Sequence, residues 1–274
     1  MLLTALLSLT GCTLESQGAH LHIVGNSASS SEEEVAWLLE LGEHLHTAIV
    51  DMHPADIQMD NEVRVELHGN YRQTSPYVDD DGTVHLWRFS EYEGGYRAMY
   101  AHELVHAVAY DSLVAPMLAE TALLDPDPGG FYLEGWAEYV ALQVDPEKTG
   151  FPLFGFDEDV VVGHWLQQDG PTLAQLRADH ATLNMPCQGQ AYILRASWFR
   201  YIDEAYGREL LMDLATGGEG LDDASVEALL GAPLTQIDAD WAAWASARYE
   251  AHPDADAEAE AYLGHMGWYV PCEG

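Results

Sequence analysis

The chain has 274 residues, with 46 acidic against 10 basic side chains and a formal net charge of -36 at pH 7. A surface of this charge repels nucleic acid, so we expect no nucleic-acid partner. The length is enough for one large or two small domains, and no internal repeat is apparent.

The chain begins with an apolar segment, residues 1–11, that is too short to span a bilayer as a folded helix and is typical of an export signal. Leu9-Thr10-Gly11-Cys12 resembles a bacterial lipobox, in which cleavage before the cysteine leaves a lipidated first residue. The resemblance implies an exported cell-envelope protein that contacts the membrane only through a lipid on Cys12. The alternative is a buried N-terminal helix with an incidental cysteine.

Two further cysteines, Cys187 and Cys272, remain once Cys12 is assigned to the anchor. This even pair could close a disulfide in an oxidising compartment. The sequence contains no Cys-x-x-Cys motif, so a metal site would have nitrogen and oxygen ligands. Such ligands favour a catalytic site over a structural thiolate site.

The N-terminal half carries the patterns of both strands and helices. Residues 20–24 predict a short strand. Ser31 precedes three glutamates and predicts the start of a helix, which Pro54 ends. Alternating polar and apolar residues at 63–68 and 83–89 predict two more strands.

The rest of the chain is predicted to be mostly helical, with breaks near residues 150–152, 170–171, 186 and 217–218. The fold class is therefore α+β: we expect a single domain of residues 12–274 in two lobes, a mixed lobe of about residues 12–115 and a mainly helical lobe of about residues 116–274, with a cleft between them. The acidic segment 251–260 is predicted to be a solvated helix or tail.

The pentapeptide His102-Glu103-Leu104-Val105-His106 is the strongest functional signal. On a helix, residues four apart share one face, so His102 and His106 can bind one tetrahedral zinc ion while Glu103 serves as general base. The alternative is a solvated face or the edge of a core. A buried helix is favoured because the flanking residues are mainly apolar: Tyr96, Met99, Tyr100, Leu104, Val105, Ala107 and Val108.

A second segment, Leu133-Glu134-Gly135-Trp136-Ala137-Glu138-Tyr139, follows the pentapeptide. Together the two segments resemble the gluzincins, the peptidase MA-like superfamily of thermolysin and the aminopeptidases. The resemblance implies a zincin-like fold with Glu134 as the third zinc ligand, and residues 83–89 at the upper edge of the cleft. Residues 191–207 and 231–234 also look like later gluzincin segments, whereas Phe131-Tyr132 departs from the tryptophan of many relatives.

The resemblance suggests two supporting residues. Glu138 lies one helical turn after Glu134 and could orient a zinc-binding histidine through the other ring nitrogen, or it could simply face solvent. Tyr192 could donate a hydrogen bond to the oxyanion of the transition state, or it could be a core tyrosine.

We therefore expect a metallopeptidase that holds one zinc ion and hydrolyses a peptide or protein substrate, with endopeptidase activity favoured over exopeptidase activity. Two alternatives stay open. The first is a zincin-fold binding or assembly lipoprotein with little peptidase activity, which the presence of Glu103 disfavours. The second is a zinc hydrolase that acts on a non-peptide amide or ester.

Overall fold

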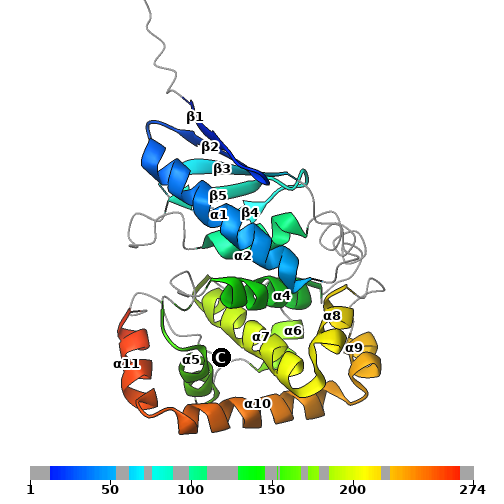
Figure 1. The fold of residues 1–274 in the computed structure, drawn as a ribbon. Helices are drawn as coiled ribbons and strands as arrows, with labels where there is room; N and C mark the ends of the chain where they lie inside the picture. The colour runs from blue at the N-terminus through cyan, green and yellow to red at the C-terminus, as the bar shows by residue number, and fades with distance from the viewer. Residues whose placement is uncertain are drawn as a thin grey trace, which may run out of the picture.

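The computed structural model describes residues 13–53, 62–70, 76–88, 99–109, 129–145, 153, 155–167, 172–178, 185–216 and 223–265. The fold is mixed α/β, as predicted: an N-terminal sheet with two helices lies against a C-terminal group of helices (Figure 1). Among the described residues, no helix is both long and apolar enough to cross a membrane.

The sheet has five strands in the order β1-β2-β3-β5-β4, with β1 and β4 antiparallel at its two edges. Between them, β2, β3 and β5 are parallel. The strands are β1 (Thr13–Gln17), β2 (Leu21–Asn26), β3 (Val63–Asn70), β4 (Tyr77–Val78) and β5 (Val84–Arg88).

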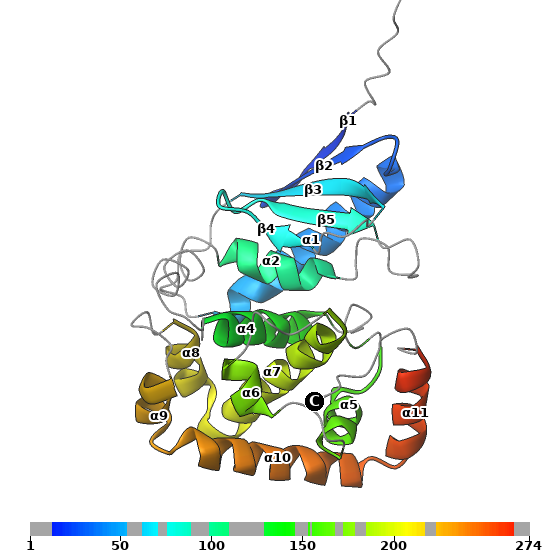
Figure 2. The ribbon, with the colours of Figure 1, turned by 180° about the vertical axis from the view of Figure 1, so that it is seen from behind.

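One face of the sheet is buried because apolar residues alternate with polar ones along each strand. Val65 of β3 and Leu86 of β5 are fully buried on this face. Helices α1 (Glu32–Met52) and α2 (Tyr100–Val108) contact the sheet. In Figure 2 the molecule is turned so that the strands lie in front of α1, and no described helix covers their open face.

The start of α1 is confirmed where the sequence predicted it. Ser31 is the N-cap, and its side chain accepts a hydrogen bond from the backbone N–H of Glu34 at 3.1 Å. The helix ends at Met52, and its C-cap His53 directly precedes Pro54. At that end, Trp136 Nε1 of the helical half donates to His53 Nε2 at 3.3 Å, which joins the two halves of the molecule.

The C-terminal half is a set of helices, mostly as predicted, but Pro186 lies inside a helix instead of at a break, and the boundaries near residues 207, 231–233 and 252–254 were not predicted. The helices are α4 (Gly129–Val144), α5 (Glu158–Leu166), α6 (Leu173–Ala178), α7 (Met185–Tyr206), α8 (Arg208–Thr216), α9 (Asp223–Leu230), α10 (Leu234–Ala251) and α11 (Ala255–His265). Helices α4 and α7 pack side by side below α2 (Figure 1).

Gly135 permits the close approach of α4 to α7. A Cβ atom at this position would lie 2.7 Å from Cε2 of Phe199 and 3.0 Å from Cβ of Arg195. Real side chains do not tolerate such contacts, so the glycine of the Glu-Gly pair has a packing role.

Three details differ from, or add to, what the sequence predicted. The strand predicted at residues 83–89 is β5, and it is an inner strand of the sheet because the short strand β4 pairs beyond it. Strand β1 was not predicted, since its residues are mostly polar. The segment 251–260 is largely exposed, as predicted, but Ala255 and Ala259, which lie one helical turn apart, are buried where α11 packs on α5.

Candidate metal centre

The two motif histidines lie on one face of α2, as their spacing predicts. His102 and His106 are buried, with 3% and 8% of their surface exposed. Their Nε2 atoms are 3.2 Å apart, and the two rings meet edge to face. Both imidazoles therefore offer a nitrogen to the same point.

Glu134 of α4 brings the third donor to this point. Its Oε2 atom lies 3.1 Å from Nε2 of His102 and 3.6 Å from Nε2 of His106. The three donor atoms lie within 4.8 Å of one another. Tetrahedral zinc, with bonds of about 2.0 to 2.2 Å, places its donor atoms about 3.3 Å apart. The donor set and its spacing fit a zinc ion.

Glu138 contacts the other side of the first histidine. Its Oε2 atom lies 2.9 Å from Nδ1 of His102, and the residue is only 1% exposed. The solvent-facing alternative is therefore wrong. A proton on Nδ1 that is donated to this carboxylate leaves the Nε2 lone pair directed at the cluster, which is the tautomer that a metal ligand needs.

The charges of the cluster perturb one another strongly. Burial opposes ionisation of Glu134, but the imidazoles of His106 and His102 outweigh it and hold the pKa of this carboxyl well below its usual range. Burial likewise opposes protonation of His102, but Glu134 and Glu138 raise its pKa well above the usual range. The pocket thus favours positive charge at its centre, whether as protons or as a metal ion.

Glu103 lies beside the cluster on α2 and is 4% exposed. Burial raises its pKa, while the adjacent imidazoles of His102 and His106 oppose that shift. A carboxylate whose pKa is raised toward neutrality both accepts and releases a proton readily, as a general base must.

Tyr192 comes from α7 and reaches the same centre. Its ring meets the ring of His102 edge to face at a centroid distance of 5.2 Å. The negative charge of Glu134, followed by burial, raises the pKa of Tyr192 well above its usual value. The phenol therefore keeps its proton and remains a hydrogen-bond donor.

Arg195 was missed by the sequence analysis. It follows Tyr192 by three residues on α7, and its guanidinium carbon lies 5.8 Å from the centroid of that ring. The side chain is 1% exposed, and burial lowers its pKa against the opposing effect of Glu134. The signal available in the sequence was an arginine one helical turn after a candidate catalytic tyrosine.

The predicted lipidation site Cys12 and the predicted disulfide partner Cys272 lie outside the described residues. Cys187 lies in α7, but its side chain is also outside the described part. The anchor and the disulfide therefore stay predictions. No protein-family model matches the chain, and no curated protein matches it either.

Proposed function

We propose that the protein is a zinc-dependent metallopeptidase of gluzincin type with a zincin-like fold. The observation that best supports this proposal is the convergence of His102 and His106 with Glu134 on one buried point, within 4.8 Å of one another. His102, His106 and Glu134 would hold the ion. When bound, zinc supplies the Lewis acidity that makes a water nucleophilic near neutral pH.

Glu103 is the proton carrier of the proposed reaction. Its carboxylate removes a proton from the attacking water and delivers it to the amide nitrogen as the peptide bond breaks. Its place next to His102 in the sequence puts it on α2 beside the cluster, and its burial raises its pKa. Both observations support a role in moving the proton without serving as one of the three ligands.

Tyr192 and Arg195 supply positive potential on the α7 side. As the water attacks, negative charge grows on the carbonyl oxygen of the substrate. The protonated phenol of Tyr192 donates to that oxygen, and the buried guanidinium of Arg195 lies over the tyrosine ring. Glu138 keeps the His102 ring in position throughout.

The test is Glu103→Gln, because glutamine has nearly the same shape but cannot accept the proton. We expect the variant to retain its zinc, measured by elemental analysis, and to hydrolyse a mixed peptide library about 10² to 10⁴ times more slowly. Glu33→Gln, at an exposed glutamate of α1, is the matched control and should leave the rate unchanged.

Three outcomes separate the candidate functions. Peptide hydrolysis that a chelator abolishes and zinc restores supports the peptidase. Zinc binding without hydrolysis of peptides, amides or esters would instead favour the binding or assembly protein. Hydrolysis of small esters or amides alone would favour the non-peptide hydrolase. Near-wild-type peptide turnover by Glu103→Gln would contradict the mechanism.

The location in the cell envelope is a separate proposal, supported by the lipobox-like residues 9–12 alone. Cells that express the full chain should incorporate labelled palmitate into the protein, and the Cys12→Ala variant should not. Release of unlabelled wild-type protein into the medium would point to ordinary signal cleavage.

A further inference from the structure

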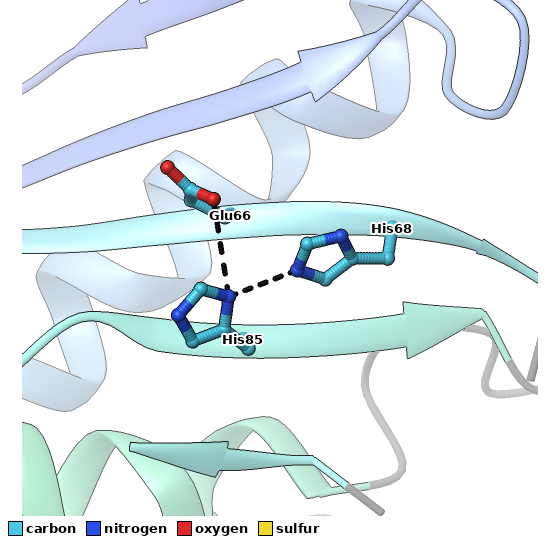
Figure 3. A group of neighbouring side chains, drawn as sticks. All are labelled: Glu66, His68 and His85. Atoms are coloured by element: carbon cyan, nitrogen blue, oxygen red, sulfur yellow. Dashed lines mark hydrogen bonds and ion pairs between the residues drawn. The ribbon is translucent and has the colours of Figure 1, made fainter. Parts of the chain in front are cut away.

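A second group of two histidines and one glutamate lies on the open face of the sheet, away from α1. Glu66 and His68 are alternate residues of β3, so both point to the face opposite the buried Val65 and Leu67. His85 of β5 pairs with Glu66 in the parallel register and points to the same side. Figure 3 shows the three side chains converging in front of the two strands.

The donor atoms of this cluster are spaced like those of the α2–α4 centre. Nε2 of His68 lies 2.9 Å from Nδ1 of His85, and the same Nδ1 atom lies 3.8 Å from Oε2 of Glu66. All three donors lie within 4.8 Å of one another. A tetrahedral ion at about 2.0 to 2.2 Å needs separations near 3.3 Å, which a small side-chain adjustment supplies.

The side chains around the cluster orient its donors. Asp79 Oδ2 lies 3.0 Å from Nε2 of His85, which leaves Nδ1 of that ring for the cluster. The other oxygen, Asp79 Oδ1, accepts from the backbone N–H groups of Asp81 and Thr83 at 3.0 and 2.9 Å. The carboxylate is thus fixed by its own turn. This is the carboxylate–histidine arrangement that accompanies metal ligands in proteins.

The glutamate is oriented in a comparable way. Nε of Arg64 donates to Oε1 of Glu66 at 2.9 Å, so Oε2 is the oxygen that faces His85. The indole of Trp87 stacks on His68 at a centroid distance of 4.5 Å, and Tyr77 stacks on His85 at 4.7 Å. These contacts hold both imidazole rings before any ion arrives, which lowers the cost of ordering them.

We propose that Glu66, His68 and His85 form a second binding site for a divalent first-row transition ion, of which zinc is the probe of choice. Two imidazoles and one carboxylate suit zinc, copper or nickel better than magnesium or calcium. The three residues are only partly buried, so water completes the coordination. This site is independent of the proposed peptidase activity.

The same geometry also permits a metal-free chain of hydrogen bonds from Asp79 through His85 to His68. Zinc titration of the untagged, chelator-treated full chain by calorimetry, with excess Mg²⁺ to occupy general acidic sites, separates the two. We expect two zinc ions per wild-type chain. His85→Ala should retain one ion, and His68→Gln or Glu66→Gln should give the same loss if the alanine variant folds poorly.

His22→Ala is the matched control, because His22 also points to the open face, from the neighbouring strand β2, but pairs with Glu15 instead of the cluster. It should keep both ions. His106→Ala should lose only the ion at the α2–α4 centre. One ion in the wild type that persists in all three β3–β5 variants would overturn the second site and leave the peptidase proposal standing. One ion in the wild type that persists in His106→Ala would overturn zinc binding at the α2–α4 centre and leave the second site standing.

Discussion

The two clusters of this molecule contain the same donors, two histidines and one glutamate, in opposite surroundings. The α2–α4 cluster (His102, His106 and Glu134) is enclosed between helices, whereas the β3–β5 cluster (Glu66, His68 and His85) lies half exposed on an open sheet face. Donor type alone therefore does not decide the chemistry of a site. The neighbouring side chains do.

The carboxylates near the two clusters differ in whether they can transfer a proton. Glu103 is buried beside the α2–α4 cluster with a raised pKa, which suits proton transfer. At the β3–β5 cluster, Arg64 occupies one oxygen of Glu66, and two backbone N–H groups hold Asp79. Glu66 is thus held as a proposed ligand, and Asp79 is held as the group that orients His85. We therefore propose hydrolysis for the first cluster and ion binding for the second.

The proposed difference between the two clusters would be wrong if both of them served hydrolysis, and this is the test with the largest expected effect. His106→Ala should lower peptide turnover about 10³-fold or more, since a catalytic metal contributes several kcal/mol to the transition state. His85→Ala should leave turnover unchanged at saturating zinc. Steady-state rates on one peptide substrate measure both variants. An equal loss in the two would mean that the clusters act together.

Tyr192→Phe tests the proposed catalytic role of the tyrosine beside the α2–α4 cluster. Turnover should fall about 10² to 10³-fold with little change in KM, because the phenol acts only once charge develops on the substrate oxygen. Tyr201→Phe, on the same helix but packed against Tyr206 and Trp244, is the control and should keep full turnover. A core role for Tyr192 would instead leave turnover intact and shift Tm alone.

The orienting carboxylates allow a symmetric test. Glu138→Gln should weaken zinc binding at the α2–α4 cluster, and Asp79→Asn at the β3–β5 cluster, each by about 10 to 100-fold. Each substitution should leave the affinity of the other cluster unchanged. Competition with a chromogenic chelator gives both constants. Weakening of both clusters by either variant would indicate a general loss of structure.

His53 is a buried histidine that joins the two halves of the molecule through Trp136. Burial lowers its pKa. Its Nδ1 lies 2.7 Å from the carbonyl oxygen of Ile49, and its Nε2 accepts from Trp136, so the native contacts require a neutral ring. Below about pH 6.5, His53 binds a proton in the unfolded state but stays neutral in the folded state. The contribution of His53 to the free energy of unfolding therefore falls as pH falls.

His53→Gln removes this titration. The free energy of unfolding of the wild type, minus that of the variant, should decrease as pH falls below about 6.5, by at most about 1.4 kcal/mol per pH unit. Urea unfolding of both proteins across this range provides the values. A difference that does not change with pH would show that His53 does not carry the dependence.

The residues of the α2–α4 cluster could be predicted because they form pairs that are close together in the sequence. His102 and His106 lie one helical turn apart, as do Glu134 and Glu138, and only the pairing of α2 with α4 had to come from resemblance. The β3–β5 cluster was not predicted from the sequence, because the pairing of Glu66 with His85 is set by the parallel register of two strands. The available signal was Glu66 and His68 at alternate positions of one predicted strand, with His85 in the next predicted strand.

The parts of the fold that were missed have a similar cause. Strand β4 has two residues, Tyr77 and Val78, and becomes a strand only because it pairs with β5. Arg195 is a charged residue in the interior, where composition alone would not place it. In each case, tertiary contacts override the local pattern.

The most direct test of the central claim is anomalous diffraction at the zinc absorption edge from crystals of the zinc-loaded protein. We predict a strong peak about 2.0 to 2.2 Å from Nε2 of His102, Nε2 of His106 and a carboxylate oxygen of Glu134. A zinc-loaded crystal with no anomalous peak between α2 and α4 would contradict the account.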